Sequence, residues 1–231
     1  MFFDFKFWHF LTDPRQLAFQ LQTAEIRGFK KRVWAIFLIG IALFAIREIW
    51  GMGTESITPL LATMSTTDYT IARYASLIGT LAWSLIYMAF HFFGVAYLLS
   101  LLTGIPFKRL LPLQLLVTGL LVMEKALVFL VFTMKGATAN VSFLSFGPLA
   151  ITFLDYSYFV LFLNQLTITT ALAIVLQYRF ISTYSSGFDR KRLFWLLFGI
   201  HIVMALIVAA ISFIPMENLF HSIVERGVSH E

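Results

Sequence analysis

Two charged residues interrupt an apolar segment near the middle of the chain. Residues 110–134 read LLPLQLLVTGLLVMEKALVFLVFTM, and the segment contains Glu124 and Lys125. At ~1.5 Å per helical residue, about 20 apolar residues cross the ~30 Å hydrocarbon core of a bilayer. A charged group at such depth costs roughly 2.5 to 3.5 kcal/mol, so it normally faces protein or water and has a partner. The segment therefore predicts a membrane span that packs against other helices.

Asp155 is the candidate partner for Lys125. Lys125 lies about 15 Å below Lys135, where the span is expected to end, and its long side chain can reach upward. Asp155 lies about 8 Å below the expected start of the next span. We therefore predict that Lys125 pairs with Asp155, because an unpaired charge in lipid is so costly. Glu124 is expected on another face, since consecutive helical residues point ~100° apart.

A second group of polar residues is expected deeper in the membrane, each about 20 Å from the outer side. It comprises His91, Asn164, Gln165 and His201, with Glu124 just above them. Such a group can be a hydrogen-bonded packing cluster, a proton relay or a metal site. We favour packing, because two histidines on separate spans are a weak metal pattern.

The motifs of the common enzyme classes are missing from the sequence. There is no HExxH, GxSxG, Walker lysine loop or GxGxxG in a strand-to-helix context, and there is no cysteine. We therefore expect no catalytic residues, no bound metal, no cofactor and no enzymatic activity.

The composition is that of a membrane protein. The 231 residues are 59% hydrophobic, above the ~45 to 50% of soluble domains, and the mean hydropathy is +0.84. The net charge of +5 could suggest nucleic acid, but the basic residues flank apolar segments, which indicates membrane topology instead. We expect one all-α bundle and no nucleic-acid partner.

Five membrane spans are expected, which would place the two chain ends on opposite sides of the membrane. They are residues 33–50, 74–102, 110–134, 150–178 and 193–215, followed by an outer tail at 216–231. The cytoplasmic segments would hold Lys6, Arg15, Arg27, Lys30, Lys31, Arg32, Lys108, Arg109, Arg179, Arg190, Lys191 and Arg192. The outer segments would hold Arg47, Arg73, Lys135 and Arg226. This bias predicts a cytoplasmic amino terminus and an extracytoplasmic carboxyl terminus.

Residues 1–32 predict an amphipathic helix on the cytoplasmic surface. Aromatic side chains dominate the first ten residues, which suits the headgroup region of a membrane. Asp13 and Pro14 then indicate a helix start, with Asp13 as the cap and Pro14 at the first helical position. The helix would be an interfacial anchor or a docking element for a protein partner.

Several of these features together resemble a known family. The Asp13-Pro14 helix start, the five close spans, the turn at Gly104-Ile105-Pro106 and the short outer tail are similar to the Yip-domain (Ypt-interacting protein domain) membrane proteins of the bacterial branch. The resemblance implies a non-enzymatic companion of a MacB-type ABC exporter. Protection against toxins or antimicrobial peptides would be its context.

The expected function is that of an accessory subunit in the cell membrane, where its partners would be lipids and an ABC efflux complex. Self-association is also possible. The candidate docking surfaces are the segment 13–29 and the small residues Gly79, Gly94 and Gly119, which permit close helix approach. The alternative is a small proton-coupled carrier that uses Glu124, His91 and His201.

Overall fold

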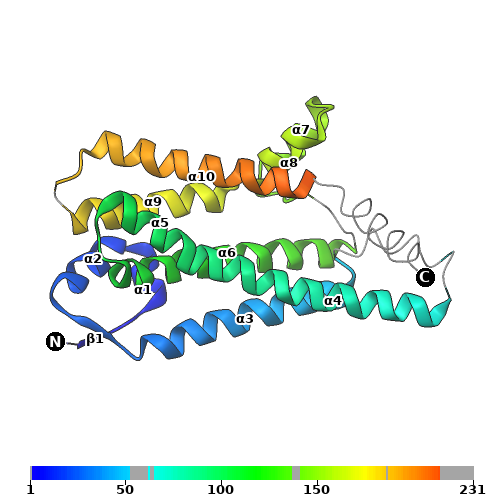
Figure 1. The fold of residues 1–231 in the computed structure, drawn as a ribbon, viewed down its shortest axis with the longest axis horizontal. Helices are drawn as coiled ribbons and strands as arrows, with labels where there is room; N and C mark the ends of the chain where they lie inside the picture. Colours follow the sequence, from blue (N-terminus) through cyan, green and yellow to red (C-terminus); the bar gives the residue numbers. More distant parts are fainter. Residues whose placement is uncertain (1, 53–61, 63–64, 137–140, 186, 214–231) are drawn as a thin grey trace, which may run out of the picture. The chain divides into compact units, whose positions relative to one another are not determined.

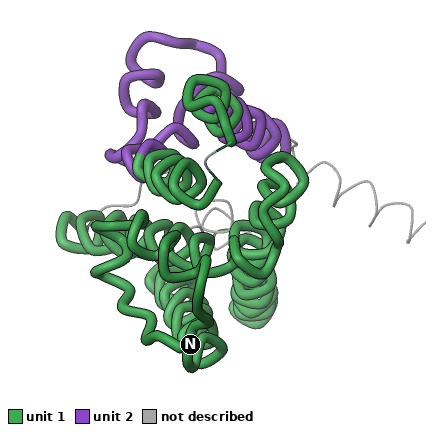
Figure 2. The backbone as a smooth tube through the Cα atoms, turned by 90° about the vertical axis from the view of Figure 1, so that its left-hand side faces the viewer, with its two compact units in different colours: residues 1–140, 172–197 green, residues 141–171, 198–231 purple. Residues whose placement is uncertain are grey.

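Helices dominate the fold in the computed structural model, which describes residues 2–52, 62, 65–136, 141–185 and 187–213. The chain divides into two compact units (Figure 2). Unit 1 comprises residues 1–140 and 172–197, and unit 2 comprises residues 141–171 and 198–231. The expected outer tail, 216–231, lies outside the described residues.

Unit 1 is built around one long helix. Its long elements are α3 (Phe29–Trp50), α4 (Thr66–Ala89), a π-helix (Phe90–Gly94), α5 (Val95–Thr103) and α6 (Phe107–Lys135). Helices α3 and α5 and the π-helix all pack on α6, and α3 also packs along α4 (Figure 1). Leu113, Leu115 and Leu116, which point in different directions around α6, are all fully buried. Helix α6 is therefore the centre of unit 1.

Two glycines let neighbouring elements approach each other closely. A Cβ atom on Gly40 of α3 would meet Met88 of α4 and lie 3.3 Å from Val122 Cγ2 of α6. A Cβ atom on Gly119 of α6 would lie 2.6 Å from the ring of Phe7. Gly119 was expected to belong to a docking surface, but it is buried inside the unit, where a larger residue would force its neighbours apart.

Among the residues that the structure describes, four helical stretches are long and apolar enough to cross a membrane. They are Phe29–Trp50, Thr66–Thr103, Phe107–Lys135 and Arg190–Phe213, the last being α10. They correspond to the expected spans 33–50, 74–102, 110–134 and 193–215. The predicted turn also occurs, since Gly104 ends α5 with a φ of +69° and Pro106 immediately precedes α6. The fold therefore indicates a predominantly helical membrane protein.

The expected span at 150–178 is not one continuous helix. The structure has α7 (Gly147–Phe153), α8 (Ser157–Gln165) and α9 (Ile168–Tyr184) in its place. Local hydrogen bonds occupy the break after Gln165, since Thr167 Oγ1 accepts from Thr170 N and Thr170 Oγ1 donates to Gln165 O, both at 3.1 Å. Polar side chains that bond nearby backbone in this way compete with helix continuation.

The amino-terminal segment folds against the helices of unit 1. It contains β1 (Phe2–Asp4), α1 (Phe7–Thr12), α2 (Pro14–Thr23) and β2 (Glu25–Arg27), and the two strands pair in parallel. Helix α2 begins at Pro14 as predicted, although the Asp13 side chain makes no capping bond.

The apolar face of α2 is covered by protein. Leu17, Ala18 and Leu21 are at most 3% exposed, and both α1 and α2 contact α6. Arg109 Nη1 at the start of α6 donates to Ala24 O at 3.0 Å just beyond α2. This face was expected to lie against lipid headgroups or a partner protein, and its burial leaves neither role available to it.

Candidate functional site

A row of polar residues runs along one side of α4 and into the π-helix. Its members recur every three or four residues, which places them on one helix face. They are Arg73, Ser76, Thr80, Ser84, Tyr87 and His91, and we refer to them as the α4 polar row. At ~1.5 Å per residue the row extends over about 27 Å, close to the thickness of a hydrocarbon core.

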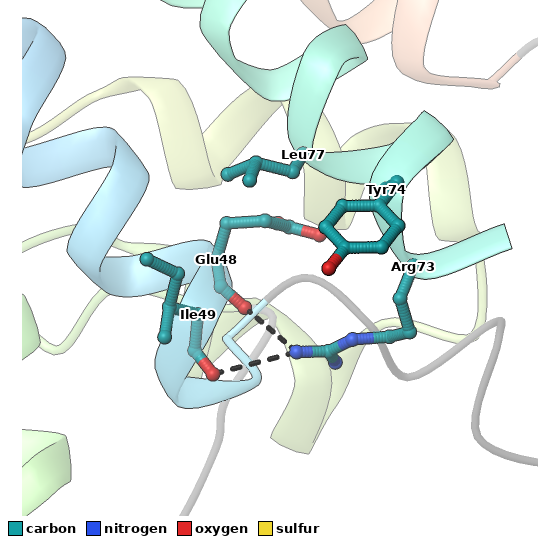
Figure 3. A pocket seen from close by; sticks show the side chains of 5 residues that line it. All are labelled: Glu48, Ile49, Arg73, Tyr74 and Leu77. Atoms are coloured by element: carbon teal, nitrogen blue, oxygen red, sulfur yellow. Dashed lines mark hydrogen bonds between the residues drawn. The ribbon is translucent and has the colours of Figure 1, made fainter. Parts of the chain in front are cut away.

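At one end of this row lies a buried glutamate from α3. Glu48 is only 4% exposed, and its carboxylate accepts hydrogen bonds from Ser76 Oγ at 2.5 Å and Thr80 Oγ1 at 3.1 Å. Arg73 Nη2 donates to the carbonyls of Glu48 and Ile49, both at 3.4 Å, as Figure 3 shows. Side chains of α4 thus donate hydrogen bonds both to the Glu48 carboxylate and to the last backbone carbonyls of α3.

A cavity of about 140 Å³ lies at this end of the row. Glu48, Ile49, Arg73, Tyr74 and Leu77 line it (Figure 3). It holds room for only a few water molecules, which makes it small for a drug-sized ligand.

The other end of the row coincides with the π-helix. The His91 ring lies 4.4 Å from that of Tyr87, and its Nδ1 is 2.9 Å from Tyr87 O. A carbonyl only accepts, so Nδ1 carries the proton in this hydrogen bond. Phe92 is buried beside Phe29 and Phe37, at ring distances of 6.4 and 5.8 Å. Single-turn π-helices occur often at functional sites.

Glu124 and Lys125 of α6 form an ion pair with each other. Lys125 Nζ lies 3.8 Å from Glu124 Oε1, and the two side chains are 30% and 2% exposed, respectively. We expected Glu124 and Lys125 to lie on separate faces of α6 and to have different partners, and this expectation is wrong. Their Cβ atoms do point apart, but both side chains are long enough to converge.

These groups form one electrostatic cluster inside unit 1. Tyr87 interacts with both Glu124 and Arg47, while His91 and Arg47 each interact with Lys125. Arg47 also faces Glu48, and its guanidinium lies 5.6 Å from the centre of the Phe44 ring. Arg47, which was counted among the basic residues of the outer segments, therefore has inward contacts. Two acids and two bases give the cluster no net formal charge, which lowers the cost of burying it.

The remaining predicted site residues belong to unit 2. Asn164 Oδ1 accepts hydrogen bonds from Ser142 N and Ser145 Oγ in the loop before α7, both at 2.9 Å. The backbone carbonyl of Gln165 accepts a hydrogen bond from Thr170 Oγ1 at 3.1 Å. Asp155 is exposed between α7 and α8, and His201 is half-buried in α10. The Lys125–Asp155 pair remains a prediction. Within the described residues, no three His, Asp or Glu side chains gather as metal ligands.

The α4 polar row was not predicted, although its signal is present in the sequence. Ser76, Thr80 and Ser84 are unremarkable alone, and Tyr87 was not singled out. Their spacing of three or four residues inside an apolar segment marks a polar face that must meet a partner. Glu48, two residues before the end of α3, is the buried acid that meets this face.

Comparison with protein-family models, with curated proteins and with solved structures finds no match for this chain. The Yip-domain resemblance therefore stays a prediction.

Proposed function

We propose that this protein is a non-enzymatic accessory subunit of the cell membrane that binds another membrane protein. The observation that carries the proposal is the internal pairing of the buried charges. Glu48 is held by hydroxyl groups of α4, and Glu124 is held by Lys125. Because these groups contact one another inside unit 1, they support the helix bundle, and binding would occur on its outer surface.

The best docking surface is the outer face of α4 around Gly79. Gly79 is exposed and has open space where a Cβ would lie, and its helical neighbours Ala75 and Ala82 are also exposed. Gly199 of α10 is equally open, but both of its neighbours four residues away are bulky, Trp195 and Val203, 66% and 53% exposed. Gly79 has one bulky neighbour at this spacing, Trp83, 47% exposed, and one small neighbour, Ala75. Small residues in membrane helices permit close approach by another helix, so the Gly79 face suits a transmembrane partner.

The resemblance to Yip-domain proteins favours an ABC efflux complex as that partner. The test compares Gly79→Leu with the matched Gly199→Leu variant, after crosslinking in native membranes and purification in mild detergent. We expect the wild type and Gly199→Leu to retain an ABC exporter, and Gly79→Leu to lose it. Recovery of no exporter from the wild type, or equal recovery with both variants, would contradict the proposal. Recovery of this chain alone would indicate a homo-oligomer instead.

The proposal includes five crossings with a cytoplasmic amino terminus. Helix α9 has 17 residues, about 26 Å of helix, which is near the lower limit for a crossing. Reporters of membrane side attached before Met1 and after Glu231 test this count. Five crossings predict reporters on opposite sides, whereas four crossings by the long helices alone predict the same side.

A proton-coupled carrier is the second candidate. The observation that favours it is the π-helix, which brings His91 into electrostatic range of Lys125 beside Glu124. This function predicts a pH-dependent flux in liposomes that Glu124→Gln abolishes and Glu48→Gln preserves. Unchanged flux in Glu124→Gln, or no flux with any solute tested, would reject it. His201, which was also assigned to this function, belongs to unit 2, so His201→Ala tests its part separately.

A further inference from the structure

A groove lies between the ends of α9 and α10 that are joined by the loop 185–189. It has a volume of about 430 Å³, within the range of small-molecule sites. Its lining residues are Ile174, Val175, Tyr178, Arg190, Lys191, Phe194 and Trp195. All of them belong to unit 1, and none is part of the buried charge cluster.

The groove has a polar end and an apolar end. Arg190 and Lys191 begin α10, and Phe194 and Trp195 follow one helical turn later, about 6 Å deeper. On the antiparallel α9, Tyr178 lies nearer the loop than Ile174, again by about 6 Å. Tyr178 is six residues before the end of α9, about 9 Å from the loop, so it lies at about the depth of Phe194 and Trp195. The two cations therefore mark the loop end, and the aromatic and apolar side chains line the rest.

The two cations are available to an anionic ligand. Within the described residues, neither Arg190 nor Lys191 forms an ion pair. The adjacent carboxylate is Asp189, whose Oδ1 accepts from the backbone N–H of Lys191 at 3.2 Å. With Arg192 next in sequence, three positive charges outweigh this acid at the start of the helix. The helix dipole adds to the positive potential there.

The position of the groove along α10 fixes the chemistry of its occupant. Helix α10 is long and apolar enough to span a membrane, so its basic first turn lies where headgroups meet acyl chains. Basic pockets between membrane helices bind anionic headgroups, and Trp195, 66% exposed, is typical of this interface. A free phosphate would use the polar end alone and leave the apolar walls uncovered.

We infer that this groove binds one anionic phospholipid. Its phosphate would contact Arg190 and Lys191, and the start of an acyl chain would lie against Ile174, Tyr178, Phe194 and Trp195. The site is independent of the proposed accessory function, since Gly79 lies on α4.

Native mass spectrometry of the full-length protein in detergent tests the inference, with dioleoylphosphatidylglycerol and dioleoylphosphatidylcholine as probes. We expect the phosphatidylglycerol adduct to form preferentially. Arg190→Gln/Lys191→Gln should weaken it about tenfold or more, since each basic group contributes roughly a factor of several to anionic-lipid binding. The matched control is Lys30→Gln/Lys31→Gln, which removes two exposed cations from the first turn of another long apolar helix, α3.

A second variant tests the shape of the groove without changing its charges. Val175 is 44% exposed at the groove wall, so Val175→Trp fills the groove without disturbing a buried residue. It should reduce the adduct several-fold while keeping both cations. If Arg190→Gln/Lys191→Gln and Lys30→Gln/Lys31→Gln lose the phosphatidylglycerol adduct equally, the binding is general electrostatic attraction and not a site. If Val175→Trp loses none of the adduct, the lipid does not bind in the groove. Equal binding of phosphatidylcholine, or displacement of lipid by inorganic phosphate alone, would also overturn the inference.

Discussion

Glu48 and Glu124 are two equally buried acids that unit 1 stabilises in different ways. Each is 4% exposed, and each lies in a helix long enough to cross a membrane. Glu48 of α3 accepts two hydrogen bonds from hydroxyl groups of α4. Glu124 of α6 is paired with the next residue of its own helix, at 3.8 Å.

The difference concerns what each acid does for the fold. The bonds of Glu48 join two helices, so its carboxylate contributes directly to the α3–α4 contact. The Glu124–Lys125 pair lies within one helix and joins nothing by itself. The pair lowers the free-energy cost of burying the Glu124 carboxylate. Glu124 also interacts electrostatically with Tyr87. Glu48 is therefore suited to a structural role, and Glu124 is the better candidate for a functional one.

The largest expected effect comes from removing the base of the second pair. Lys125→Met leaves the Glu124 carboxylate buried without its counter-ion, and breaking such a pair costs about 3 kcal/mol or more. Unfolding by steric trapping in micelles measures the loss. Lys135→Met, an exposed position at the end of the same helix, is the matched control and should lie within about 0.5 kcal/mol of wild type.

The double variant Glu124→Gln/Lys125→Met identifies the cause. Replacing both charges should recover most of the stability, because a buried pair contributes little net free energy. If the double variant is as unstable as Lys125→Met, packing of the lysine stem, and not the charge, is responsible.

A smaller effect is expected at Glu48. Glu48→Ala removes the acceptor of two hydroxyl groups and should cost about 2 kcal/mol in the same assay. Glu48→Gln keeps one carbonyl acceptor and should cost about half as much. A loss of stability in Glu48→Gln that equals the loss in Glu48→Ala would show that the negative charge beside Arg47 matters more than the hydrogen bonds.

Single hydroxyl deletions on α4 should have a smaller effect still. Ser76→Ala and Thr80→Val each remove one bond between helices, worth about 0.6 kcal/mol on average and about 1.7 at most. The matched control is Thr70→Val, because the Thr70 hydroxyl donates only to Thr66 O of its own helix, at 2.8 Å. Both deletions should become neutral in a Glu48→Ala background. Effects that persist there would separate these hydroxyl groups from Glu48.

The sequence predicts the long helices well because their signal is local. Apolar length marks α3, α6 and α10, and the Gly104-Ile105-Pro106 turn marks the boundary before α6. Pro14 likewise predicts the start of α2 correctly. These features depend on residues close together in the chain, so composition and spacing suffice.

The features that the sequence analysis missed depend on contacts between distant segments. Covering the apolar face of α2 requires α6, and the bond from Arg109 to Ala24 joins residues 85 positions apart. Asn164 of α8 likewise accepts hydrogen bonds from Ser142 and Ser145, which precede it by 22 and 19 residues. Only the α4 polar row could have been found by counting residues, because its period is that of a helix face.

The smallest expected effect tests the predicted partner of Lys125. Double-mutant cycles should give Lys125 and Glu124 a coupling energy above about 1.5 kcal/mol, because the pair is close and one member is buried. The pair of Lys125 and Asp155 predicted from the sequence requires a coupling of similar size. The ion pair of Lys125 with Glu124 and the exposure of Asp155 favour less than about 0.5 kcal/mol instead. The variants Lys125→Met, Glu124→Gln and Asp155→Asn complete both cycles in one assay. A larger coupling to Asp155 would mean that Glu124 is the less compensated acid, which would strengthen its candidacy for proton handling.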